Sequence, residues 1–244
     1  MLKLSVCCST YNRPEMLGEL IASFEMQDYP AKYRELIVLD DAGQYGDIRG
    51  KNWQVVSFPR RFASLGEKRN ACVSLTSPDS DHIVIADDDD IYLPHWLQCH
   101  ALNFENGVIW SFAHSVYWSK NNVITGKWNY QNDTFLMHPA HAFSKKLFWN
   151  YGGYPHLAGW EDHDFFKRLL EAGLEHRNSL QDKQKPYMIY RRFSGGEHIT
   201  CVSVEKYRQR QAVLPKAKLE VGWRYDYQAD IENFEKTAET VNSQ

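Results

Sequence analysis

Ile83-Val84-Ile85-Ala86-Asp87-Asp88-Asp89-Asp90 is the stretch that decides the fold, because four apolar residues run directly into four acids. The apolar run predicts a strand buried on both faces, as in a parallel sheet covered by helices. The acids then lie at the carboxyl end of that strand, where open α/β sheets bind their ligands. Adjacent carboxylates repel one another, so a cation must offset them if they are buried. A divalent metal ion with oxygen ligands is the expected cation, and a solvated acidic loop is the alternative.

The segments before this stretch repeat the same arrangement of strand and polar loop. A predicted strand over residues 2–8 ends in Ser9-Thr10-Tyr11-Asn12-Arg13-Pro14, and a second over 35–39 ends in Asp40-Asp41. Apolar spacing predicts helices over 15–26, 64–75 and 94–103, and a short third strand over 54–58. Alternating strands and helices imply a mainly parallel sheet with right-handed crossovers. The three polar loops therefore share one edge of the sheet.

The pattern changes after about residue 105. Strands are predicted over 108–112 and 115–118, with a turn at Asn121-Asn122. Helices are predicted over 145–151 and 161–172, the second ending before Gly173. The polar residues after 203 are predicted to form a helical tail packed on the domain.

Composition excludes several classes of protein. The chain has 244 residues, 43% hydrophobic and 24% charged, which is ordinary for one large globular domain with a small appendage. A net charge of −3 gives no global basic field for nucleic acid. Aromatic residues reach 14%, which suits stacking on sugar or base rings but equally suits extra packing in the core. Five cysteines without zinc or disulfide spacing, and no signal peptide or membrane-spanning run, predict a cytoplasmic protein.

Four motifs in order resemble the family-2 glycosyltransferases of the GT-A fold. They are residues 9–14, Val38-Leu39-Asp40-Asp41, the acidic run with Pro94, and Gly159-Trp160-Glu161-Asp162. The resemblance covers about residues 2–200. It implies an α/β fold whose mainly parallel open sheet is flanked by helices, with one domain over 1–203. That domain would have a Rossmann-like nucleotide-binding half (about 1–104) and an acceptor half (105–203), followed by the helical tail (204–244).

The resemblance also implies a nucleotide-diphosphate sugar as donor. Thr10 and Tyr11 match the loop that packs on the nucleotide base, and Arg13 belongs to the same loop. Asp41 matches an acid that bonds the base, usually uracil, so a UDP-sugar is the expected donor. Arg69 matches a basic residue near the nucleotide. The alternatives are a turn or helix cap for Asp40 and Asp41, and a surface charge for Arg69.

The acidic run fits the family's Asp-x-Asp-Asp pattern, which implies a bound Mn²⁺ or Mg²⁺. Asp87 and Asp89 become the named pair, with Asp89 as the direct metal ligand. Asp88 stands where the family often has a small residue, and we group it with the donor-binding residues. His198, in a glycine-containing segment, matches a further metal-binding histidine of some relatives. A structural role for His198 is the alternative.

Glu161 and Asp162 match the family's acidic pair near the acceptor. We expect Asp162 to be the catalytic base and Glu161 to contact acceptor hydroxyls, whereas stabilisation of a helix start is the alternative. Together these assignments predict a metal-dependent transferase that inverts the anomeric carbon. The rival interpretations are a nucleotidyltransferase and a non-catalytic sugar- or nucleic-acid-binding module. The acceptor (a glycan, a lipid-linked glycan, a protein or a modified DNA base) and the oligomeric state stay open.

Overall fold

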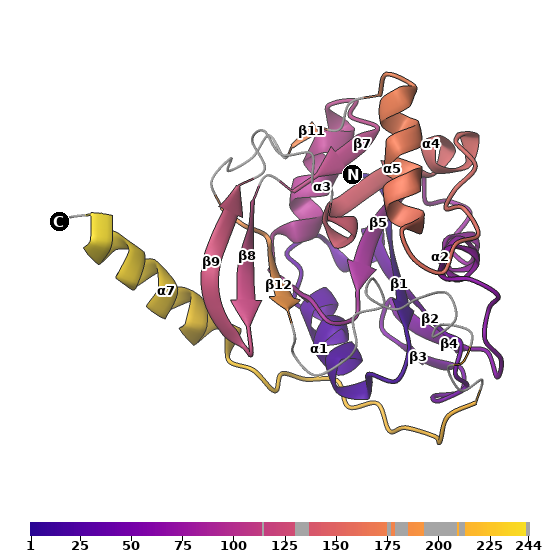
Figure 1. Ribbon diagram of the computed structural model, residues 1–244, viewed down its shortest axis with the longest axis horizontal. Helices are drawn as coiled ribbons and strands as arrows, with labels where there is room; N and C mark the ends of the chain where they lie inside the picture. Colours follow the sequence, from indigo (N-terminus) through magenta and orange to yellow (C-terminus); the bar gives the residue numbers. More distant parts are fainter. Residues whose placement is uncertain are drawn as a thin grey trace.

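The computed structural model describes residues 1–113, 115–129, 137–174, 177–178, 185–192, 209 and 213–242. Its main sheet has eight strands in the order β11-β7-β10-β5-β1-β2-β4-β3 (Figure 1). In chain order these are β1 (Leu4–Thr10), β2 (Arg34–Asp40), β3 (Ile48–Gly50), β4 (Trp53–Ser57), β5 (His82–Asp87), β7 (Trp110–Phe112), β10 (His141–Ser144) and β11 (Arg177–Asn178). The four central strands β5, β1, β2 and β4 run parallel, whereas β3 and β10 run antiparallel to their neighbours. The predicted α/β class with a mainly parallel sheet is confirmed.

Helices cover both faces of this sheet. Alternate residues of β1 face opposite sides, and each side packs against its own set of helices. Val6 and Cys8 of β1 pack with α1 (Pro14–Glu25) and α3 (Trp96–Glu105). Cys7 packs on the other face with α2 (Leu65–Ser74), α4 (Lys145–Asn150) and α5 (Glu161–Glu171). Two short 3-10 helices, η1 (Ala31–Tyr33) and η2 (His138–Ala140), complete the connections. The central strands are thus buried on both faces, as their continuous apolar runs predict.

A second, four-stranded sheet has the order β6-β12-β8-β9. Its strands are β6 (Ile91–Tyr92), β8 (Ser115–Lys120), β9 (Val123–Asn129) and β12 (Met188–Arg192). The predicted turn between β8 and β9 is confirmed, since Asn121 and Asn122 both have positive φ. β6 begins directly after the acidic run, so the run lies at the junction of the two sheets.

Within the described range 213–242 of the predicted tail, a helix begins at Tyr227. Residues 213–226, which we call the strap, have no regular secondary structure and cross α1 (Figure 1). The helix that follows, α7 (Tyr227–Asn242), packs against β8 and β9. Pro215 and Gly222 lie within the strap and disfavour a helix there. Among the described helices, none combines the length and the apolar character that crossing a bilayer requires.

The two predicted halves of the domain meet closely at the start of α2. The amide of Gly66 donates to the carbonyl of Leu157 at 3.0 Å, and a Cβ at position 66 would lie 1.8 Å from the carbonyl oxygen of Pro155. The Asn70 side chain bonds both the amide and the carbonyl of Tyr154. α2 is therefore fixed against the loop that leads into α5.

Candidate active site

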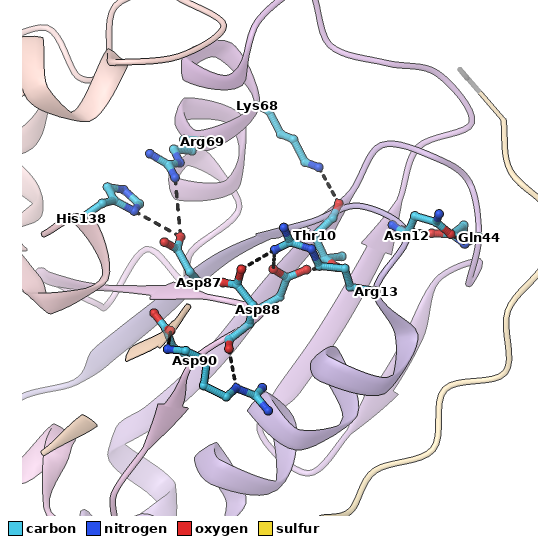
Figure 2. A network of polar contacts seen from close by, with 12 residues as sticks. Thr10, Asn12, Arg13, Gln44, Lys68, Arg69, Asp87, Asp88, Asp90 and His138 are labelled. Atoms are coloured by element: carbon cyan, nitrogen blue, oxygen red, sulfur yellow. Dashed lines mark hydrogen bonds and ion pairs between the residues drawn. The ribbon is translucent and has the colours of Figure 1, made fainter. Parts of the chain in front are cut away.

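The acidic run lies at the carboxyl end of β5, beside the ends of β1 and β2. Thr10 ends β1 and Asp40 ends β2, and both strands run parallel to β5 or to its neighbour. Figure 2 shows Thr10, Arg13 and Asp88 converging from these separate segments. The expectation that the three polar loops share one edge is confirmed.

Asp88 and Asp89 are bridged by one guanidinium group. Arg13 Nη1 lies 2.8 Å from Asp88 Oδ1 and 2.8 Å from Asp89 Oδ2, and Thr10 Oγ1 donates to Asp88 Oδ2 at 2.6 Å. Burial opposes the charge on Arg13, but the carboxylates of Asp88 and Asp89 outweigh it and raise the pKa of Arg13. Both oxygens of Asp88 are therefore used to hold the loop that follows β1.

Asp87 faces a second set of partners on the opposite side of the run. Its Oδ1 lies 3.2 Å from His138 Nδ1 and 3.5 Å from Arg69 Nη2 (Figure 2). His138 Nε2 contacts the Tyr154 hydroxyl at 2.9 Å. Burial acts to raise the pKa of Asp87, yet His138 and Arg69 hold it well below its usual range. Asp87 is ionised in this environment.

Asp90 keeps one carboxylate oxygen without a partner among the residues that the structure describes. Its Oδ1 accepts from the Arg191 amide at 2.9 Å, whereas Oδ2 is buried and unpaired. Burial and the charges of Asp89 and Asp87 raise the pKa of Asp90, and burial raises the pKa of Asp89 to about 7. Carboxylate oxygens of Asp87, Asp89 and Asp90 all lie within 4.8 Å of one another. This concentration of hard oxygen ligands, together with the orphaned buried oxygen of Asp90, fits a divalent cation.

Asp40 and Asp41, at the end of β2, have different hydrogen-bond partners. Asp40 accepts from the amides of Ala42 and Gln44, each at 2.8 Å, so the turn interpretation applies to Asp40. Asp41 is fully buried and accepts from Lys68 Nζ at 2.6 Å. Arg61 also pairs with Asp41.

Arg61 contacts both Tyr11 and Asp41. Its guanidinium lies 4.2 Å from the centroid of the Tyr11 ring and pairs with the Asp41 carboxylate. Lys68 also donates to the carbonyl of Thr10 at 2.6 Å. Tyr11 and Asp41 are thus linked through Arg61, on the face where a nucleotide base is expected.

The two acids at the start of α5 differ in how far they are buried. Glu161 is 1% exposed and pairs with Arg69, and burial raises the pKa of Glu161. Asp162 is partly exposed beside it. Trp160, which precedes the helix with a φ of 64°, has 67% of its surface exposed. Arg69 contacts both Asp87 and Glu161, so it links the acidic run to α5.

The structure brings most of the predicted site residues into two polar networks that meet at the acidic run. Thr10, Arg13, Asp88 and Asp89 form one, and Asp87, Arg69 and Glu161 form the other. His198 lies outside the described residues. Sequence reasoning did not assign Asp90, Lys68, His138 or Arg191, although the Asp-x-Asp-Asp pattern contains Asp90.

Comparison with known proteins agrees with this geometry. The sequence model described as glycosyl transferase family 2 matches residues 5–160. No curated protein sequence matches the chain significantly.

Two solved structures have similar folds at low sequence identity. The structure of S. aureus TarS 1-349 in complex with UDP-GlcNAc has a TM-score of 0.63 and 18% identity, covering 85% of this chain and 64% of that one. Mannosyltransferase PcManGT from Pyrobaculum calidifontis, in complex with GDP-Man and Mn²⁺, has a TM-score of 0.56 and 15% identity, covering 78% of this chain and 56% of that one. This chain thus spans less than two thirds of either protein. The family model covers more than half of the chain, so the protein belongs to glycosyl transferase family 2 and has the GT-A fold.

Proposed function

We propose that the protein is a metal-dependent inverting glycosyltransferase that uses a UDP-sugar donor. The observation that carries this proposal is the meeting of Asp87, Asp89 and Asp90 oxygens within 4.8 Å at the carboxyl end of β5. Family membership supports sugar transfer. The complexes of TarS with UDP-GlcNAc and of PcManGT with GDP-Man and Mn²⁺ support a nucleotide sugar and a metal ion.

Asp89 and Asp90 would hold Mn²⁺ or Mg²⁺, with Asp87 completing the set. When bound, the ion neutralises charge on the departing diphosphate. Asp88 takes no direct part, because both of its oxygens bond Thr10 and Arg13. His198 stays a prediction as a further ligand.

The base would stack on Tyr11 and donate an N–H to Asp41. Arg61 lies over the Tyr11 ring and pairs with Asp41, so binding of a base to both residues would require Arg61 to move aside. Uracil and guanine both carry a suitable N–H, and we favour uracil on the family resemblance and the TarS complex.

In the transfer step, Asp162 accepts the proton of the acceptor hydroxyl. The hydroxyl oxygen attacks the anomeric carbon from the face opposite the diphosphate, its new bond forms as the bond to the diphosphate breaks, and UDP leaves. Glu161 is a weaker candidate for the base because it is buried against Arg69.

We favour a glycan among the candidate acceptors. Trp160 next to Asp162 presents a large exposed ring, and such rings stack on the apolar faces of sugars. A net charge of −3 gives little support for DNA. Binding to DNA at low salt that weakens steeply as salt rises would move the acceptor to nucleic acid instead.

A thermal-shift series tests the donor and the metal together. UDP with Mn²⁺ should raise the melting temperature more than GDP or ADP, because at equal concentration the nucleotide with the lowest Kd stabilises the native state most. A ligand at a hundred times its Kd stabilises the native state by about 2.7 kcal/mol. Asp89→Ala should lose the Mn²⁺-dependent part of the shift. Equal shifts for the three nucleotides would contradict the uracil assignment.

Product analysis distinguishes the rival functions. Mass spectrometry after incubation with UDP-sugars and glycan acceptors should find an acceptor that is heavier by one sugar residue, together with free UDP. A nucleotidyltransferase would instead release pyrophosphate and leave a nucleotide on the acceptor. Binding of UDP-sugars without any product from a panel of acceptors would favour the binding module.

A further inference from the structure

The strap contacts the loop that follows the base-side acids. The amides of Leu214 and Ala217 donate to the carbonyls of Ala42 and Gln44 at 2.9 and 3.0 Å. Lys216 Nζ donates to the carbonyl of Gly43, which lies between them, at 2.7 Å. The strap therefore holds three consecutive carbonyls of a donor-side loop.

That loop is in turn bonded to the segment that leads to Arg13. The side-chain oxygen of Gln44 accepts from the Asn12 amide at 2.9 Å, and the two residues lie side by side in Figure 2. Asn12 has a φ of 57°, a conformation that needs support from its surroundings. The next residue, Arg13, bridges Asp88 and Asp89.

Further along, the strap crosses α1 at very short range. The Gly222 amide donates to the Gly18 carbonyl at 3.3 Å, and a Cβ at position 18 would lie 2.0 Å from the Glu220 carbonyl oxygen. The Arg224 amide donates to Glu19 Oε1 at 3.0 Å. Glu19, on α1, is 4% exposed.

Glu19 connects this crossing to the acidic run through one buried arginine. Its Oε2 accepts from Arg191 Nη1 at 2.6 Å. Arg191 is 2% exposed; its Nε donates to the Asp89 carbonyl and its amide donates to Asp90 Oδ1. Hydrogen bonds thus run without a break from the strap to two of the proposed metal ligands, and all of them beyond Glu19 are buried.

We propose that the strap helps to hold the metal ligands in place, and that Glu19 and Arg191 are positioning residues for Asp89 and Asp90. The Arg224 amide fixes one oxygen of Glu19, so the other oxygen meets Arg191 in a single orientation. Arg191 then sets the backbone at Asp89 and the carboxylate of Asp90. Replacing a residue that hydrogen-bonds to a metal ligand and orients it typically lowers metal affinity 10- to 100-fold. This inference rests on the proposed function, because the ligand of the site is the divalent ion.

Glu19→Gln tests the relay with Mn²⁺ alone, titrated by calorimetry without nucleotide. The amide nitrogen would face a donor, so the Kd for Mn²⁺ should rise by roughly 10- to 100-fold. Glu15→Gln is the matched control, since Glu15 lies one turn earlier on α1 with an exposed side chain and should leave the Kd unchanged. Removing one partner of a buried ion pair also destabilises the fold. A second variant therefore reaches the strap without touching the relay.

Gly18→Ala is that variant, because its Cβ would collide with the Glu220 carbonyl while no relay side chain is replaced. In a helix this change is stabilising by itself, so a lower melting temperature would report the collision. We expect faster hydrogen exchange at residues 214–224 and at 88–92, and a rise in the Mn²⁺ Kd. Gly126→Ala is the control, because a Cβ added at position 126 would meet nothing within 4 Å.

Two outcomes separate the inference from the proposed function. Faster exchange in the strap of Gly18→Ala, with unchanged exchange at 88–92 and an unchanged Mn²⁺ Kd, would overturn the inference. Failure of the unaltered protein to bind Mn²⁺ would overturn the proposed function. Exchange at 88–92 would still report whether the strap fixes the acids.

Discussion

At the scale of single residues, the four consecutive acids have unequal tasks. Asp88 gives both oxygens to Thr10 and Arg13, whereas Asp90 keeps one buried oxygen unpaired. The sequence predicts the acids and their place at the end of a strand. It does not predict this division, because the deciding partners lie far along the chain: Arg13 is 75 residues from Asp88, and Arg191 is 101 residues from Asp90.

Asp162→Asn is the direct test of the catalytic base. The amide keeps the shape of the side chain but cannot accept the acceptor's proton, so transfer should fall by roughly 10²–10⁴-fold. UDP binding, measured by thermal shift, should be unchanged because we assign Asp162 to the acceptor and not to the donor. Near-normal turnover of Asp162→Asn, with Glu161→Gln inactive, would exchange the two roles.

His100 gives the fold a defined dependence on pH. Burial lowers its pKa to about 3, and the ring contacts Ser111 Oγ at 2.8 Å and the Tyr187 hydroxyl at 3.2 Å. The unfolded chain binds a proton near pH 6.5 and the folded one only near pH 3. This contribution to stability is therefore complete above about pH 6.5 and is lost as the pH falls toward 3.

The free energy of unfolding should consequently fall by about 1.4 kcal/mol per pH unit within that window because of this one group. His100→Gln should flatten the slope in urea titrations between about pH 6.5 and 4, whereas the exposed His156→Gln should not. An equal slope in both variants would assign the dependence to other groups.

At the scale of secondary-structure elements, α2 serves two parts of the site from consecutive positions. Lys68 reaches Asp41 and the Thr10 carbonyl, and Arg69 reaches Asp87 and Glu161. Both lie in the early turns of the helix, just after its N-cap. The order of that end of α2 should therefore govern donor binding.

Ser64→Ala tests this dependence. Ser64 Oγ accepts from the Glu67 amide at 3.1 Å, and loss of such a cap costs about 1 kcal/mol. Ser144→Ala removes the equivalent bond to Leu147, also 3.1 Å, at the start of α4. Both variants should lose similar stability in urea, but only Ser64→Ala should weaken UDP binding. Equal UDP affinity in the two variants would count against a role for the cap in the site.

Elements predicted from the sequence differ in how local their signal is. The strand that became β5 and the helices that became α1 and α5 each carry a continuous run or a regular apolar spacing, and their bounds are close to those predicted. In the second sheet, β8 and the turn after it are predicted, but β6 carries no such signal, because it has only two residues and pairs with β12 almost a hundred positions away. Nothing near β6 in the sequence could reveal that pairing.

At the scale of the whole molecule, the two predicted halves are interleaved rather than adjacent. β10 pairs antiparallel with β5, placing Ala142 opposite Val84 and Phe143 opposite Ile83, and β7 lies beyond it. A strand of the predicted acceptor half thus covers the edge of the strand that carries the acids. The predicted division at about residue 104 is therefore not a boundary between independent folding units.

A protein ending at residue 129 should therefore fail to fold cooperatively. Without β10, the apolar β5 becomes an unprotected edge, which favours association with other chains. Circular dichroism should show no sharp thermal transition, and size-exclusion chromatography should show aggregates. A monomeric fragment with a cooperative transition would contradict the interleaved arrangement.

The pairing of β10 with β5 also determines how long the edge of β5 stays unpaired during synthesis of the chain. Ribosomes add about 5–20 residues per second, so Ser144 follows Asp87 into the nascent chain by about 3–11 s. Throughout that interval the newly made strand of apolar residues has only β1 beside it, and its other edge can pair with any extended neighbour. Rapid translation of this stretch, or early capture by a chaperone, would shorten the exposure, whereas a pause between residues 87 and 144 would lengthen it and lower the yield of folded protein.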